Sequence, residues 1–65
     1  MKIILNGAET EVVEGTLVGV METLGYVKKL YATAVNGNFV RASERNTFIL
    51  KAGDKVEIVS PRAGG

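Results

Sequence analysis

The sequence predicts an α+β domain in which a mixed sheet of four to five strands packs against one helix. Three observations predict it. The chain opens with two strand-like segments joined by an Asn-Gly pair, continues with a segment of helical apolar spacing, and later alternates polar and apolar residues as a strand does. Its 65 residues are close to the lower limit for one stable core. We therefore expect a single domain over residues 1–60 and a flexible C-terminal tail over residues 61–65.

A β-hairpin is the first predicted element. Residues 2–6 are mostly apolar and partly β-branched, which is typical of a strand. Asn6-Gly7 tolerates the positive φ angles that a tight hairpin turn requires. Residues 9–13 then provide the antiparallel return strand.

A helix of about two turns is expected next. Apolar side chains recur at the i, i+3, i+4 and i+7 spacing of one helical face, and they are Leu17, Val20, Met21 and Leu24. Thr16 is a candidate N-cap, and Gly25 stands where a glycine would end the helix. We interpret the apolar stripe as core that packs on the sheet.

The second half of the chain predicts further strands. Residues 32–35 and 39–41 flank a turn at residues 36–38, residues 47–50 form a short apolar stretch, and a turn at residues 52–54 leads into a strand over residues 55–59. In that last strand, Val56 and Ile58 share one face and Glu57 lies on the other. A helix that follows a hairpin must cross the sheet, so we expect the last strand beside the first and parallel to it.

The composition excludes several kinds of site. The chain has no cysteine and no histidine, which removes thiolate ligands, a cysteine nucleophile and the usual base at neutral pH. Its seven carboxylates show no calcium-loop spacing, so we expect neither a metal site nor catalytic residues. A net charge of +1 argues against a nucleic-acid partner, and no apolar run is long enough to span a membrane. The default expectation is a soluble cytoplasmic protein that is a monomer when alone.

The strongest functional signal is the C-terminal segment Ala63-Gly64-Gly65. Glycine lacks a Cβ, so a Gly-Gly arm can enter a channel too narrow for other residues. The carboxylate of Gly65 would then be displayed for chemistry that another protein performs.

The whole chain resembles the ubiquitin-like sulfur-carrier proteins. The resemblance rests on the order of hairpin and helix, on Ala34-Val35-Asn36-Gly37, on the segment from Ala52 to Val59, and on the terminal Gly-Gly. Within that group the chain is most similar to the thiamine-biosynthesis carriers (ThiS), which are related to the molybdopterin-synthase small subunits (MoaD). The resemblance implies a β-grasp fold, as in ubiquitin.

The resemblance also implies a mechanism centred on Gly65. An ATP-dependent E1-like activating enzyme of the ThiF or MoeB type would adenylate its carboxylate, and a persulfide sulfur donor would convert it to a thiocarboxylate. Gly64 and Ala63 would enter the channel of that enzyme. Thiazole synthase, or another sulfur acceptor, would receive the sulfur. The chain itself would bind no cofactor stably, and the activating enzyme would consume the ATP.

Other functions stay open on the sequence alone. A protein modifier of ubiquitin type would share the fold and be joined to lysines through Gly65, and the molybdopterin-synthase carrier is a further alternative. A binding module with an incidental Gly-Gly end would be indifferent to loss of Gly65. Each alternative differs from the thiamine carrier in its product or its acceptor.

A docking surface for the activating enzyme is also expected. The two-residue period of strands turns Ile4 away from the core, and the parallel last strand is expected to bring Val59 close to it. This apolar pair would lie near the tail and be rimmed by Arg41 and Arg62. The alternative is that Ile4 and Val59 are residues at the edge of the core.

Overall fold

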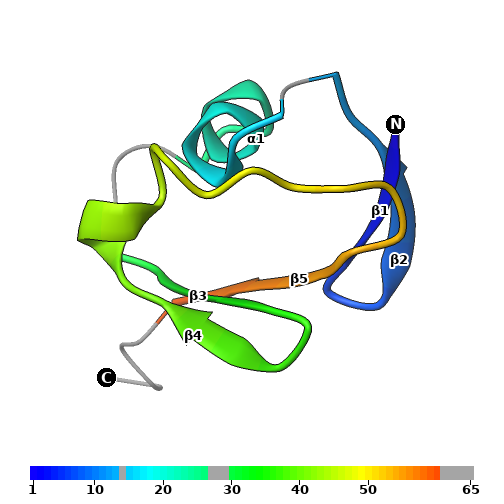
Figure 1. The fold of residues 1–65 in the computed structure, drawn as a ribbon. Helices are drawn as coiled ribbons and strands as arrows, with labels where there is room; N and C mark the ends of the chain where they lie inside the picture. Colours follow the sequence, from blue (N-terminus) through cyan, green and yellow to red (C-terminus); the bar gives the residue numbers. More distant parts are fainter. Residues whose placement is uncertain (14, 27–29, 61–65) are drawn as a thin grey trace.

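The computed structural model describes residues 1–13, 15–26 and 30–60, and it shows a five-stranded sheet with one α-helix across a face (Figure 1). The elements in chain order are β1 (Lys2–Leu5), β2 (Ala8–Glu11), α1 (Leu17–Thr23), β3 (Ala32–Val35), β4 (Asn38–Val40), a 3₁₀ turn η1 (Ala42–Glu44) and β5 (Lys55–Val59). The predicted α+β class is therefore confirmed.

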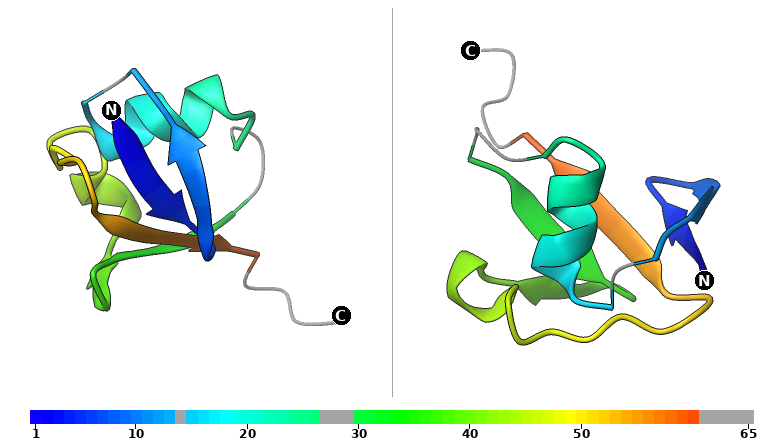
Figure 2. Two further views of the ribbon diagram at one scale, coloured as in Figure 1. Left: turned by 90° about the vertical axis from the view of Figure 1, so that its right-hand side faces the viewer. Right: turned by 90° about the horizontal axis from the view of Figure 1, so that it is seen from above.

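The strands lie in the order β2-β1-β5-β3-β4, so β5 occupies the centre of the sheet. It is parallel to β1 and antiparallel to β3, while β1–β2 and β3–β4 are antiparallel hairpins. The two further views in Figure 2 also show α1 lying across one face of this sheet. The predicted parallel placement of the last strand beside the first is confirmed.

Both Asn-Gly pairs form hairpin turns, as predicted, but the second turn has two residues and not the predicted three, so β4 begins at Asn38 and ends at Val40, one residue earlier than the predicted 39–41. The φ angles are 49° at Asn6 and 87° at Gly7, and 52° at Asn36 and 83° at Gly37. Two successive positive φ angles define the turn whose twist matches that of a hairpin. The first turn contains only two residues, so Ala8 pairs with Leu5. The return strand therefore begins and ends earlier than the predicted 9–13.

The helix has the predicted caps. The hydroxyl of Thr16 accepts a hydrogen bond from the backbone N–H of Gly19 at 3.1 Å, and Gly25 has a φ of 93°. Leu17, Val20 and Met21 are buried, as expected. Leu24 was expected in the same stripe, but it is 37% exposed, because the helix ends at Thr23 and Leu24 has left helical geometry.

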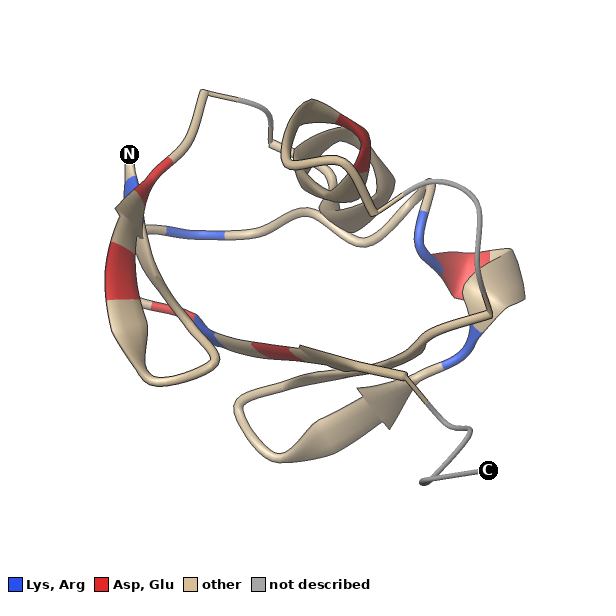
Figure 3. Ribbon diagram, turned by 180° about the vertical axis from the view of Figure 1, so that it is seen from behind, with Lys and Arg blue, Asp and Glu red and all other residues tan. Residues whose placement is uncertain are grey.

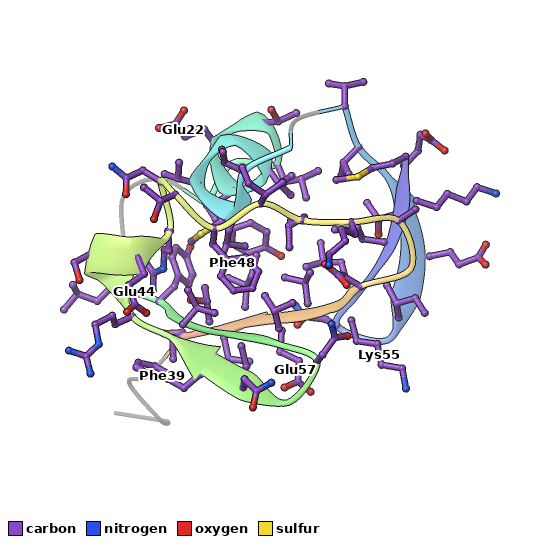
Figure 4. All side chains as sticks on the ribbon, viewed as in Figure 1. Glu22, Phe39, Glu44, Phe48, Lys55 and Glu57 are labelled. Carbon is purple, nitrogen blue, oxygen red and sulfur yellow. The ribbon has the colours of Figure 1, made fainter. Side chains whose placement is uncertain are left out.

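The core lies between α1 and the sheet. The buried side chains of the helix form one cluster with Ile3 of β1 and with Val56 and Ile58 of β5. Phe48 packs against this core between the layers (Figure 4). Its segment runs beside the start of α1, where the N–H of Leu17 donates to the carbonyl of Phe48 at 2.9 Å. The apolar stretch 47–50 is therefore not a full strand: it contributes one isolated bridge, between Ile49 and Thr16.

Candidate functional site

The C-terminal end of β5 is the part of the described structure nearest in sequence to the predicted reactive terminus. β5 ends at Val59, and Ser60 is the last described residue. The predicted site residues Arg62, Ala63, Gly64 and Gly65 lie outside the described residues. The site is therefore built from the strand that leads to them and from the surface around it.

β5 divides its side chains between two faces of the sheet. Val56 and Ile58 are buried under the helix, whereas Lys55, Glu57 and Val59 are exposed. Figure 4 shows Lys55, Glu57 and Phe39 on the side of the sheet away from α1. No element of the described chain covers this side, which we call the open face.

A shallow hollow of about 240 Å³ lies on the open face across β3, β4 and β5. We call it the open-face groove, and its lining residues are Ala32, Thr33, Ala34, Phe39, Glu57 and Val59, of which Thr33 is buried, with its hydroxyl bonded to the Val40 carbonyl. The register explains the hollow: Ala34 pairs with Phe39 on one side and Glu57 on the other, and Ala32 pairs with Val59. Small alanine side chains between larger neighbours leave a depression in the sheet surface.

The groove is an apolar surface beside the end of β5. Phe39 on β4 is 67% exposed and Val59 on β5 is 53% exposed, and the alanines of β3 lie between these two strands. Exposed apolar side chains gathered in a hollow make this groove a candidate docking surface. Phe39 was not predicted as a site residue. The alternation of β4 indicates the side of the sheet on which its side chain lies, but it does not show that the alanines of β3 lie beside it.

The expected proximity of Ile4 and Val59 is wrong. Both side chains point away from the core side of their strands, as predicted, but Ile4 pairs with Lys55 at the start of β5. Val59 lies four residues further along the strand, which corresponds to about 13 Å. Ile4 is half-buried at the other end of the open face and does not line the groove.

Arg41 was expected at the rim of the docking surface. It is exposed and directly follows the last residue of β4, with an extended backbone of φ −74° and ψ 159°. The alternation of the strand puts it on the same side as Phe39, but it is not among the residues that line the groove. Glu57, which does line the groove, places a carboxylate there.

Two asparagine side chains hold the two ends of β5. The amide of Asn6 donates from Nδ2 to the carbonyl of Ile58 at 3.1 Å and accepts at Oδ1 from the Ile58 N–H at 3.0 Å. The amide of Asn36 accepts from the N–H of Lys55 at 3.0 Å and donates to Asp54 at 3.0 Å. Each Asn-Gly turn thus fixes the central strand in addition to closing its own hairpin.

A sequence comparison assigns the chain to a family. The model of the ThiS family matches residues 3–65, which is nearly the whole chain. The chain belongs to the ThiS family. Among solved structures, it resembles the thiamine biosynthesis protein ThiS of Geobacter metallireducens with a TM-score of 0.86 and 20% sequence identity, over 100% of both chains. At that identity the likeness shows the fold, and it confirms the predicted β-grasp architecture. No curated protein sequence matches the chain.

Within residues 1–13, 15–26 and 30–60 there is no group of three or more His, Cys, Asp or Glu side chains that could hold a metal ion. No helix in the same ranges is long and apolar enough to cross a membrane.

Residues of both charge signs are spread along the ribbon (Figure 3). The amino group of Met1 contacts the carboxylate of Glu11 at 2.9 Å at the sheet edge formed by β2. This hydrogen bond and the attraction between the two charges hold the pKa of Glu11 below its ordinary value. The pair lies on the edge strand away from β3 and β4, so it takes no part in the groove.

Proposed function

We propose that this chain is the sulfur carrier of thiamine thiazole biosynthesis and carries the sulfur as a thiocarboxylate at Gly65. The observation that carries the proposal is that the family match extends through residue 65 and so includes Gly64-Gly65. Membership in the ThiS family supports the carrier role. The chemistry at the terminus and the partners described below belong to the proposal.

The reaction makes a carboxylate into a sulfur nucleophile. A carboxylate oxygen of Gly65 attacks the α-phosphorus of ATP, and pyrophosphate leaves. A persulfide on the sulfur donor then attacks the acyl carbon, and AMP leaves with the electrons of the C–O bond. A second thiol attacks the donor's sulfur in the resulting acyl disulfide. The S–S bond of the acyl disulfide breaks, a new disulfide joins the second thiol to the donor, and the thiocarboxylate leaves with the electrons of the broken bond. The thiocarboxylate finally delivers its sulfur to thiazole synthase.

The chain acts as a substrate in this scheme, and the E1-like enzyme supplies the catalysis. The chain contains neither histidine nor cysteine, so a base and nucleophile of the usual kinds must come from the partner. Carriage of sulfur on the backbone terminus needs no side chain. No resident cofactor is required, because the partner binds and consumes the ATP.

The position of the groove supports this division of labour. Val59 lines the groove, and Gly65 follows Ser60 by five residues, which can reach at most about 18 Å when extended. A partner seated on the groove therefore has the carboxylate within reach of a site in its own interior. We propose that Phe39 and Val59 form the apolar centre of the surface that the activating enzyme contacts, with Arg41 at its border.

Intact-mass spectrometry tests the proposal. The protein is incubated with an E1-like enzyme, ATP and a persulfide donor, and a variant lacking Gly65 serves as the control. We expect the full chain to gain the mass difference of sulfur for oxygen on its C-terminal peptide, and the shortened chain to stay unchanged. An isopeptide bond to other proteins in place of the mass gain would instead identify a modifier of ubiquitin type. Transfer of sulfur to a molybdopterin precursor in place of thiazole synthase would identify the molybdopterin pathway.

A further inference from the structure

The side chain of Asn6 replaces a strand on one side of β5. Backbone pairing between β1 and β5 joins Ile4 with Lys55 and Leu5 with Val56. The N–H of Asn6 then donates to the carbonyl of Val56 at 2.9 Å, and at Asn6 the chain turns away into the hairpin. β5 continues past this point without a backbone partner from β1.

The amide of Asn6 takes over where the backbone of β1 ends. It satisfies both the N–H and the carbonyl of Ile58, at 3.0 and 3.1 Å, as a neighbouring strand would. On its other side, β5 stays paired with β3 as far as Val59. Ile58 is also the last core side chain of the described chain, at 3% exposure. The end of β5 is thus fixed on both edges and from the core.

We propose that Asn6 is a positioning residue for the C-terminal carboxylate, a role that rests on the proposed function. By fixing Ile58, its amide holds the end of β5 next to the groove that Val59 lines. Because Gly65 follows Ser60 by only five residues, a fixed strand end limits the positions that its carboxylate can reach while a partner occupies the groove. The effective concentration of the carboxylate at the partner's site is then higher than it is from a loosened strand end.

Asn36 supplies a matched control within the same chain. It also precedes a glycine in a two-residue turn, its φ is 52° against 49° for Asn6, and its amide also binds a β5 backbone N–H. It acts at Lys55, however, the first residue of β5, and so at the opposite end from the tail. Replacement of either asparagine by glycine keeps the positive φ free of strain and removes only the amide.

The test compares Asn6→Gly with Asn36→Gly as substrates of the activating enzyme, with ATP-dependent pyrophosphate exchange as the assay, at a temperature where melting curves show both variants folded. For Asn6→Gly we expect kcat to fall by about 3- to 10-fold with KM within about twofold of the original chain, because orientation and not docking is lost. For Asn36→Gly we expect both constants within about twofold of the original. Hydrogen exchange of the Ile58 amide should accelerate in Asn6→Gly alone.

A second variant keeps the test decisive if Asn6→Gly does not fold. Asn6→Asp retains an acceptor for the Ile58 N–H but loses the donor and sets a carboxylate against the Ile58 carbonyl, so kcat should fall again. An unchanged kcat, an equal loss in Asn36→Gly, or an effect on KM alone would each overturn the positioning role. If the original chain is not adenylated at all, the proposed function fails, and the positioning role fails with it. If the original chain is active and the Asn6 variants have the same kcat, the positioning role alone fails.

Discussion

Arg45 donates a hydrogen bond of 3.0 Å from its Nε to the hydroxyl of Thr33, a residue on the core side of β3. The same hydroxyl donates to the carbonyl of Val40 at 2.6 Å, and Nη2 of Arg45 donates to the carbonyl of Tyr31 at 2.6 Å. The carbonyl of Arg45 accepts from the N–H of Val18 in α1 at 3.1 Å. One arginine after η1 therefore joins the β3–β4 pair under the groove to the helix.

Replacement of Thr33 by valine should destabilise the fold. Valine has nearly the same shape but neither donates to the Val40 carbonyl nor accepts from Arg45, so one buried and one partly buried hydrogen bond are lost. We expect a loss of about 1–3 kcal/mol in the free energy of unfolding, measured by urea denaturation. Thr47→Val is the control, because Thr47 is exposed, and it should change stability by less than about 0.5 kcal/mol. Equal effects of the two substitutions would contradict a structural role for the Thr33 hydroxyl.

Removal of the exposed aromatic ring from the groove should weaken partner binding without unfolding the protein. Phe39→Ser removes a side chain that is 67% exposed, so little burial is lost and the melting temperature should stay within a few degrees, about 3 °C at most. KM for the activating enzyme should rise by about tenfold, the effect of losing roughly 1.4 kcal/mol of contact. Val13→Ser, at an apolar residue that is 86% exposed and outside the groove lining, is the matched control and should leave KM unchanged. A normal KM for Phe39→Ser would move the docking surface elsewhere.

Gly64→Val should abolish adenylation, because a β-branched side chain obstructs a channel that admits a glycine arm and restricts the backbone angles open to it. The buried core cluster of the described residues runs from Ile3 to Ile58, so the melting temperature should be preserved. Differential scanning calorimetry and pyrophosphate exchange measure the two effects separately. A large fall in melting temperature would assign the terminal residues a structural role in place of the proposed one.

Glu11 should contribute to the pH dependence of the free energy of unfolding at acidic pH. The Met1 amino group lowers the pKa of Glu11 in the folded state, so this contribution is fully present above the ordinary carboxyl pKa near 4.5 and is lost as the pH falls through the lower folded value. An NMR titration of the Glu11 side chain should show the lowered pKa. Acetylation of the Met1 amine should return it toward the ordinary value, and a titration that acetylation leaves unaltered would contradict this assignment.

Local patterns were enough to predict most of the fold. The Asn-Gly turns, the Thr16 cap and the alternation of residues 55–59 each depend on neighbours in the sequence, and all three are confirmed. The prediction that Leu24 is buried is wrong, because the apolar spacing continues in the sequence beyond the point where the helix ends.

Strand register is what the sequence could not predict. The register between β1 and β5 depends on how the two strands align when their side chains pack, and local sequence does not determine it. The prediction placed Val59 near Ile4, but Ile4 pairs with Lys55, four residues earlier in β5, and Val59 pairs with Ala32. The groove was missed for the same reason, since it exists only where Ala32 and Ala34 meet Val59 and Phe39 across three strands. The amide contacts of Asn6 and Asn36 likewise join residues 52 and 19 positions apart.

The pairing of β1 with β5 also determines when this protein can fold during its synthesis. Lys2–Leu5 emerges first during synthesis and must wait for Lys55–Val59 before the middle of the sheet can close. Until then the core lacks Val56 and Ile58, and the hairpins have no common strand to dock on. Closure of so long a loop slows folding to the order of milliseconds or longer. A nascent chain therefore lacks the groove. A partner that recognises the groove binds only chains in which β5 has been synthesised and inserted into the sheet.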